Sequence, residues 1–247
     1  MDARYGRAWL TLVTGLVLLL VTASTAAAAV KAPGAVSTVT VKRTQGLAVL
    51  LRDQPALSKP DARAAPVGLV RARRPITLGS TVLPVVGQAT GPRGAAWLRV
   101  RLPGRPNGHT GWIRRSATAP ASTSWHIVVA TSSRRVTVYR VGRVVRVFTA
   151  IVGTSSTPTP KGKFFVEEGV ELRASAAGAP FALALSARSE VLQEFAGGPG
   201  QIALHGLSNV GGVLGTAASH GCVRVTNDAM RWLVVRIGPG TPVTITS

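Results

Sequence analysis

The stretch His205–Asn227, HGLSNVGGVLGTAASHGCVRVTN, holds the only cysteine of the chain, Cys222, and two of its four histidines. His220 stands two residues before Cys222, whereas His205 is separated from it by sixteen small, glycine-rich and uncharged residues. Such a composition suits a loop that folds back and brings its two ends together. A single thiol that a histidine meets in space is the minimum requirement for a cysteine nucleophile.

The chemistry of a thiol explains why a histidine is needed. A free cysteine titrates near ~8.5, so only a few per cent of it is thiolate at neutral pH. A neighbouring imidazole can take the proton, and the resulting ion pair keeps the sulfur nucleophilic. Gly221 lets the backbone approach a substrate carbonyl closely, and peptide N–H groups there can hold an oxyanion. The alternative reading is that Cys222 is a small buried hydrophobe beside two structural histidines.

The run Ser219-His220-Gly221-Cys222, followed by Val223 and Arg224, resembles the signature of L,D-transpeptidase catalytic domains, the YkuD-type family of bacterial cell-wall enzymes. In the variant with arginine after the apolar residue, an asparagine follows three positions on, and Asn227 occupies that position. A second element of that family is a Pro-Thr-Pro-x-Gly-x-Phe turn, which residues 158–164 match about sixty residues upstream of Cys222.

This resemblance implies a role for each residue of the motif. Cys222 is the expected nucleophile, and His205 is the expected general base, with its ring oriented by the Gly206 carbonyl. His220 and Gly221, together with Cys222, are expected to provide orientation and the oxyanion donors.

The resemblance also implies roles for the polar residues of the motif. Ser219 is expected to fix the loop by hydrogen bonding. Arg224 and Asn227 are expected to bind substrate. For Arg224, capping the loop is an equally good alternative to binding a substrate carboxylate.

The function that the resemblance implies is cross-linking of the cell wall. Cys222 would attack the carbonyl before the terminal D-Ala of a peptidoglycan tetrapeptide stem, and an amine of a neighbouring stem would resolve the thioester. The family also implies covalent inhibition by carbapenems. Two alternatives stay open: an L,D-carboxypeptidase, in which water replaces the amine, and a non-catalytic cell-wall binding protein with a silent thiol.

A metal site is a weak alternative for this stretch. Zinc needs three or four ligands, and only Asp228 adds a carboxylate near Cys222 and the histidines. No nucleotide or metal motif is present elsewhere in the sequence. The sequence therefore predicts neither a metal nor a cofactor.

The composition restricts the possible partners. The chain has 247 residues, of which 46% are hydrophobic, and it carries 29 Lys and Arg against 9 Asp and Glu, a net charge of +20. An excess of this size attracts polyanions such as nucleic acid, anionic lipid or anionic cell-wall polymers. The arginines are scattered, aromatic residues are few and no nucleic-acid motif is present, so nucleic acid is not a predicted partner.

Residues 1–29 have the features of a secretory signal peptide. Arg4 and Arg7 precede an apolar run over 8–21, and an alanine-rich stretch at 23–29 offers a cleavage site. The apolar run is too short for a confident membrane span, although an uncleaved anchor remains the alternative. The predicted location is therefore outside the membrane, in the cell wall or a periplasm-like space, where a lone cysteine can form no internal disulfide.

The next two segments differ in character. Residues 30–65 alternate short apolar pieces with proline and charge, which predicts a linker. Residues 66–119 contain strand patterns at 81–86, 96–102 and 110–114, with a hairpin signal at Asn107-Gly108. They resemble the small Src-homology-3-like barrels that accompany bacterial cell-wall enzymes. Trp97 and Trp112 are expected in the core of this barrel rather than on a binding face.

Residues 123–247 form the predicted catalytic domain, after a short linker over 116–123. A meander of three strands is expected at 125–130, 135–140 and 143–152, with His126 in a structural role. Later strands are expected at 180–185, 201–204 and 240–246, and a helix capped by Asn227 over 228–237. The predicted fold is mainly β: a small β-barrel followed by a β-rich catalytic domain with one C-terminal helix.

Overall fold

The computed structural model describes residues 39–195 and 197–247, all of which fall in one compact unit. The predicted signal peptide over 1–29 and the first part of the predicted linker lie outside these residues. No helix in the described part of the chain has the length and apolar character that a membrane span requires. The described residues are mainly β, as predicted.

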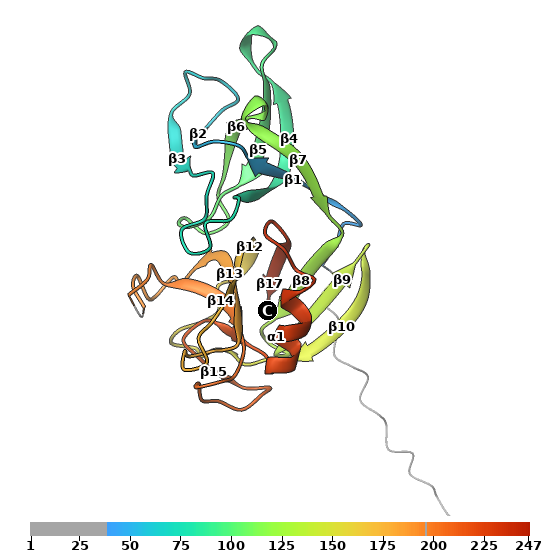
Figure 1. Ribbon diagram of the computed structural model, residues 1–247, viewed down its shortest axis with the longest axis vertical. Helices are drawn as coiled ribbons and strands as arrows, with labels where there is room; N and C mark the ends of the chain where they lie inside the picture. The colour runs from blue at the N-terminus through green and yellow to red at the C-terminus, as the bar shows by residue number, and fades with distance from the viewer. Residues whose placement is uncertain (1–38, 196) are drawn as a thin grey trace, which may run out of the picture. The chain divides into compact units, whose positions relative to one another are not determined.

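The first half of the described chain forms a seven-stranded sheet in the order β3-β2-β6-β5-β4-β1-β7 (Figure 1). We call it the N-terminal sheet. Its strands are β1 Gln45–Leu50, β2 Gln54–Leu57, β3 Pro66–Val70, β4 Val82–Thr90, β5 Ala96–Arg101, β6 Thr110–Arg114 and β7 Thr118–Thr123, with 3-10 turns at Pro92–Gly94 and Arg115–Ala117. The three predicted strands correspond to β4, β5 and β6, and β5 pairs with β6 as the predicted hairpin. Trp97 is 2% exposed and therefore a core residue, whereas Trp112 is half-buried.

Two predicted linkers are wrong. Residues 45–57, expected in the 30–65 linker, form β1 and β2, because short apolar stretches there bury side chains such as Leu47 and Leu50. Residues 118–123, expected in the second linker, form β7, which pairs with β1 from Gln45↔Thr123 to Leu50↔Thr118. Pro120 is tolerated because β7 is an edge strand, where a missing N–H costs no ladder bond.

The second half of the described chain, which we call the C-terminal half, is built on an eight-stranded sheet in the order β10-β9-β8-β17-β12-β13-β14-β16 (Figure 1). Its strands are β8 Trp125–Ala130, β9 Arg135–Arg140, β10 Arg143–Thr149, β12 Gly162–Glu171, β13 Phe181–Arg188, β14 Gln201–His205, β16 Val223–Arg224 and β17 Pro242–Thr246. A two-stranded sheet pairs β11 Val152–Gly153 with β15 Ala217–Ser219. The predicted meander β8-β9-β10 is confirmed.

The last strand, β17, lies in the middle of this sheet. It runs parallel to β8, with Val243 opposite Ile127, and antiparallel to β12, with Val243 opposite Phe164. The C-terminal strand therefore joins the meander to the strands that carry the candidate site. His126, on β8, shares a hydrogen bond between its Nε2 and Thr244 Oγ1 at 2.8 Å, and burial lowers its pKa to about 4. These contacts agree with a structural role.

The helix α1, Asn227–Val234, is shorter than predicted and its cap is one residue earlier. Thr226 is the N-cap, because its hydroxyl accepts a hydrogen bond from the Ala229 N–H at 3.2 Å. Ala229, Met230 and Leu233 bury the apolar face of the helix in the core of the eight-stranded sheet. The prediction of Asn227 as the cap is therefore wrong, and its side chain is free for a different task.

An ion-pair network links the N-terminal sheet to the C-terminal half. Glu167 accepts from Arg74 and from Arg188 at 2.9 Å each, and the side chains of Glu167 and Arg74 are 6% and 5% exposed. Phe165, beside this network on β12, is fully buried in the core of the N-terminal sheet. The two halves therefore share both an apolar contact and a buried charge cluster.

Candidate active site

The candidate nucleophile and base lie on neighbouring parallel strands. β14 pairs with β16 so that Leu204 is opposite Val223 and His205 is opposite Arg224. Cys222 directly precedes β16, so the pairing brings it beside Ala203, two residues before His205 on β14. Both Cys222 and His205 line one pocket of about 310 Å³.

The orientation of the His205 ring is fixed by the backbone. Its Nδ1 lies 2.8 Å from the Gly206 carbonyl oxygen. A carbonyl only accepts, so Nδ1 carries the proton and Nε2 of the neutral ring is the atom free to act as a base. Gly178 has φ +86°, and a Cβ there would lie 2.3 Å from His205 Nδ1. Only glycine fits at this position, which no sequence motif marks.

Burial keeps both reacting groups neutral. Burial raises the pKa of the Cys222 thiol, while a backbone hydrogen bond at Ala203 and the charge of Arg224 oppose that rise. Burial also lowers the pKa of His205, although the Gly206 carbonyl opposes this shift. The predicted resting thiolate–imidazolium pair is therefore not favoured. The directions of the two pKa shifts favour a neutral thiol and a neutral imidazole in the same pocket.

Ser219 stabilises the loop of residues 219–222 by hydrogen bonds. Its hydroxyl donates to the Cys222 carbonyl at 2.6 Å and accepts from the Gly221 N–H at 3.1 Å. The Gly221 N–H is consequently engaged within the loop, which corrects its prediction as an oxyanion donor. Within residues 39–195 and 197–247, the N–H of Cys222 meets no hydrogen-bond acceptor. Gly221 remains necessary because its φ is +117°.

The Pro-Thr-Pro turn lies directly against this loop. The hydroxyl of Thr159, which is buried, donates to the Gly221 carbonyl at 2.9 Å and accepts from the Gly153 N–H at 2.9 Å. Thr157 donates to the Ser219 carbonyl at 3.2 Å. The two sequence signatures, about sixty residues apart, therefore form one hydrogen-bonded structure around Cys222. The role of Thr159 was not predicted from the sequence.

Arg224 lines the pocket and also supports its rim. Its Nη1 donates to the Gly211 carbonyl at 2.5 Å, which holds the loop after His205. Its Nε is buried and has no partner within the described residues. Nη1 of the guanidinium is therefore bound to the loop after His205, while the side chain also lines the pocket.

Asn227 does not line the pocket. Its Oδ1 accepts from the Leu207 N–H at 2.8 Å, and its Nδ2 donates to Ser208 Oγ at 2.9 Å. Both ends of the amide are therefore used to tie the start of α1 to the segment after His205. The prediction that Asn227 binds substrate is corrected to a positioning role.

His220 and Phe195 face each other across the mouth of the pocket. His220 is exposed, and its ring stacks on Phe195 with centroids 5.5 Å apart and an interplanar angle of 30°. Phe195 belongs to the segment 189–200, which supplies Leu192 and Gly200 to the same pocket. We call this segment the pocket-wall loop.

Arg105, in the connection between β5 and β6 of the N-terminal sheet, binds the pocket-wall loop. The guanidinium of Arg105 donates to the carbonyls of Ser189 at 2.7 Å, Leu192 at 3.1 Å and Pro199 at 3.1 Å. Asn107 adds a reciprocal pair with the backbone of Arg188, at 2.7 and 2.8 Å. No sequence signal identified this contact, because it joins residues more than eighty positions apart.

No group of three or more His, Cys, Asp or Glu side chains able to hold a metal ion occurs in the part of the chain that the structure describes.

Residues 124–245 match the family model of the L,D-transpeptidase catalytic domain, YkuD. No curated protein sequence matches the chain.

Several solved structures are similar to this chain. L,D-transpeptidase 3 from Mycobacterium tuberculosis, in complex with a faropenem-derived adduct, is 15% identical, with a TM-score of 0.45 over 68% of this chain and 91% of that one. An L,D-transpeptidase from Mycobacterium smegmatis is 17% identical, with a TM-score of 0.41 over 81% and 99%. A mutant L,D-transpeptidase from Enterococcus faecium is 20% identical, with a TM-score of 0.38 over 49% of each chain, so this chain spans about half of that protein.

Proposed function

Because residues 124–245 belong to the L,D-transpeptidase catalytic domain family, we propose that this protein is a cysteine-dependent L,D-transpeptidase that cross-links peptidoglycan stem peptides. The observation that carries the proposal is the arrangement of His205, whose Nδ1 is held by the Gly206 carbonyl at 2.8 Å while its ring lines the pocket of Cys222. This arrangement leaves a neutral base at the reacting thiol.

The proposed first half-reaction acylates Cys222. As Sγ attacks the carbonyl carbon before the terminal D-Ala of a tetrapeptide stem, the thiol proton passes to Nε2 of His205. The peptide C–N bond then breaks, D-Ala leaves as a neutral amine with the proton from His205, and a thioester remains. The oxyanion of the tetrahedral intermediate is assigned to the free N–H of Cys222.

The second half-reaction releases the product. A side-chain amine of a neighbouring stem attacks the thioester, and His205 takes one of its protons. The C–S bond breaks, the new amide forms, and the proton returns to the sulfur of Cys222. The guanidinium of Arg224, which lines the pocket, is our candidate to bind a carboxylate of either stem.

Two further parts of the proposal concern inhibition and location. A carbapenem would acylate Cys222 through its strained β-lactam carbonyl, because that carbonyl presents the same electrophile as the scissile amide. The basic, apolar and alanine-rich order of residues 1–29 supports export to the cell wall.

The test is incubation of the protein with a tetrapeptide donor and an amine acceptor stem, followed by mass spectrometry. Cross-linked dimer is the expected product, and tripeptide alone would instead indicate a carboxypeptidase. Cys222→Ala should remove turnover by several orders of magnitude. Turnover that survives in this variant would refute the nucleophile, and absence of any reaction in the folded wild type would favour a wall-binding protein.

An independent check uses intact-mass measurement after exposure to a carbapenem. A covalent adduct on the wild type that is absent from Cys222→Ala is expected. A folded wild type that stays unmodified would contradict the proposed site.

A further inference from the structure

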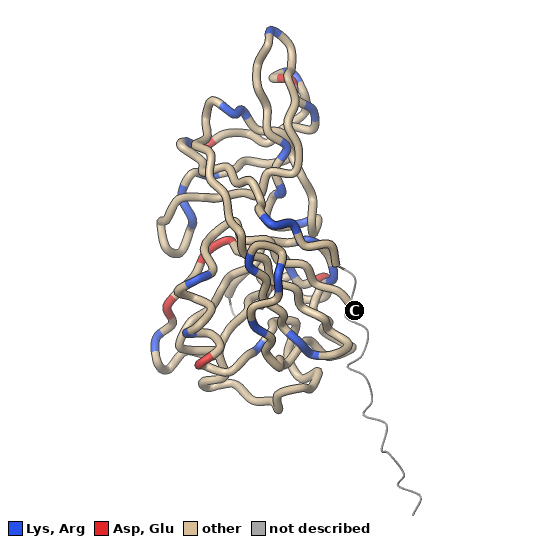
Figure 2. The backbone as a smooth tube through the Cα atoms, turned by 90° about the vertical axis from the view of Figure 1, so that its right-hand side faces the viewer, with Lys and Arg blue, Asp and Glu red and all other residues tan. Residues whose placement is uncertain are grey.

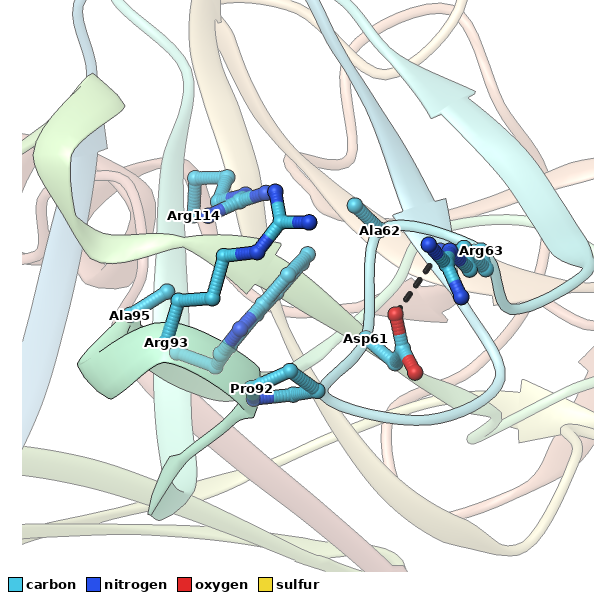
Figure 3. Close-up of a pocket in the computed structure, with 8 residues that line it drawn as sticks. Asp61, Ala62, Arg63, Pro92, Arg93, Ala95 and Arg114 are labelled. Carbon is cyan, nitrogen blue, oxygen red and sulfur yellow. Dashed lines mark hydrogen bonds between the residues drawn. The ribbon is translucent and has the colours of Figure 1, made fainter.

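A second pocket, of about 220 Å³, lies at the N-terminal sheet and is lined by three arginines (Figure 3). Figure 3 shows Arg93 and Arg114 side by side on one wall, with Arg63 across the pocket beside Asp61. The remaining lining residues are Ala62, Pro92, Ala95 and Trp97. The pocket shares no residue with the catalytic pocket.

The positive charge of this pocket exceeds the negative charge that lines it, because three arginines face one carboxylate. None of its three arginines forms an ion pair within the described part of the chain. Asp61 is the only carboxylate in the lining, and its Oδ1 accepts from the backbone N–H of Arg63 at 2.9 Å. Like charges gathered around one cavity repel each other, and an anion placed between them relieves that repulsion.

The side chain of Trp97 forms part of the pocket lining. Trp97 is 2% exposed, and its indole N–H is buried without an acceptor in the described residues. The guanidinium carbon of Arg114 lies 4.3 Å from the centroid of the indole ring, so the cation stacks on the Trp97 face. The buried indole therefore supports the Arg114 cation in the pocket wall.

The backbone of the pocket also brings its groups close together. Arg93 adopts a left-handed conformation, with φ 57° and ψ 29°, in the turn between β4 and β5. Gly91 lets that turn approach the indole, because a Cβ there would lie 2.6 Å from Trp97 Nε1. The result is a pocket in which three arginine side chains share a single carboxylate, that of Asp61.

We propose that this arginine pocket binds an oxyanion, a carboxylate or phosphate group carried by an anionic polymer of the cell wall. Arginine suits such a group, because its planar fork of N–H donors matches two oxygens at once. The N-terminal sheet thereby holds the enzyme on the polymer in which the catalytic pocket works. The proposal does not depend on turnover at Cys222.

The first experiment titrates the full protein with inorganic phosphate and with citrate, while the indole N–H signals are followed by NMR. Saturable movement of the Trp97 signal, identified through Trp97→Phe, is expected. The double variant Arg63→Gln/Arg93→Gln should weaken the apparent affinity about tenfold, since it removes two charge-assisted contacts. The pair Arg52→Gln/Arg73→Gln removes the same charge from exposed positions outside the pocket and should change affinity less than twofold.

The second experiment measures sedimentation with insoluble peptidoglycan, either stripped of phosphate polymers or left intact. Binding to both preparations assigns the oxyanion to carboxylates, and binding to the intact form alone assigns it to phosphate. With either preparation that binds the wild type, the double variant Arg63→Gln/Arg93→Gln should bind less peptidoglycan than the wild type does. Equal losses in the two double variants would reduce the effect to general charge attraction, and a stationary Trp97 signal would exclude the pocket; both results overturn the proposal.

Discussion

The thiol of Cys222 is half-buried beside an imidazole that burial keeps neutral. Because burial raises the pKa of Cys222 above its ordinary value, few sulfurs are thiolate near neutral pH. In the proposed mechanism the thiol proton therefore leaves during the attack rather than before it, and His205 is the residue proposed to receive it. The ring of His220 instead stacks on Phe195.

The pH dependence of alkylation tests this description. The rate of Cys222 modification by iodoacetamide should rise through pH 9 without a plateau, because the pKa lies above the usual ~8.5. His205→Gln should leave this curve nearly unchanged while lowering turnover about 10²- to 10⁴-fold, the range for a general base. A plateau below pH 8 that disappears in His205→Gln would instead establish a resting ion pair.

Gly178 should be as necessary as the residues that react. In Gly178→Ala the new Cβ would meet His205 Nδ1 at 2.3 Å and displace the ring from the thiol, so turnover should fall at least about 100-fold. Gly94→Ala is the matched control, because Gly94 has φ +73° with nothing within 4 Å. Both variants should lose about 1 kcal/mol of folding free energy. Equal turnover in the two variants would contradict the steric argument.

Among the elements, the pocket-wall loop is held in place by the side chain of Arg105, which belongs to the half that contains the N-terminal sheet. Arg105 donates to three of its carbonyls, at both ends and near the middle, while the Ser189 N–H donates to the Gly200 carbonyl at 2.7 Å. A loop held in this way keeps Leu192 and Phe195 at the pocket without a strand or helix of its own.

Removing that clamp should loosen the loop without unfolding the protein. In Arg105→Gln we expect faster hydrogen exchange over 189–200 and a KM for the donor stem raised about tenfold, because substrate binding must then order the loop. Arg99→Gln is the matched control, since Arg99 is exposed and donates only to Thr110 Oγ1. Unchanged exchange over 189–200 in Arg105→Gln would show that the loop holds its shape alone.

Across the whole molecule, the charge is distributed rather than concentrated. Figure 2 shows Lys and Arg along the backbone of both halves, with few acidic residues between them. Two acidic residues are buried, Glu167 and Glu168. Glu167 pairs with the guanidinium groups of Arg74 and Arg188 and also accepts a hydrogen bond from Gln201 Nε2 at 3.1 Å. Beside it, Glu168 accepts from the backbone and the hydroxyl of Thr77.

Glu167→Gln should therefore lower the free energy of unfolding of both halves together. The substitution keeps the shape but leaves two largely buried cations facing an amide, at a cost of about 3 kcal/mol in the free energy of unfolding. Glu171→Gln, on the same strand but exposed, should change that free energy by less than about 0.5 kcal/mol. Chemical denaturation followed by fluorescence measures both, and equal stabilities would show that the network is not a fastening between the halves.

The sequence by itself determined the chemistry and the regular strands. Cys222, His205 and the Ser219–Cys222 motif are local patterns of residue type, and the meander from 125 to 149 consists of runs rich in valine with turn residues between its strands. These features are encoded over a few neighbouring residues, so they are readable without the fold. The same is true of the helix near 228, though not of its cap.

Only the tertiary structure decided which distant segments meet. The pairing of β1 with β7, the central place of β17 and the clamp from Arg105 all join residues far apart in the chain. The neutral state of Cys222 and the engagement of the Gly221 N–H are likewise consequences of what surrounds them. Burial and hydrogen-bond partners are properties of surfaces in contact, and a sequence motif carries the reacting groups without stating what will enclose them.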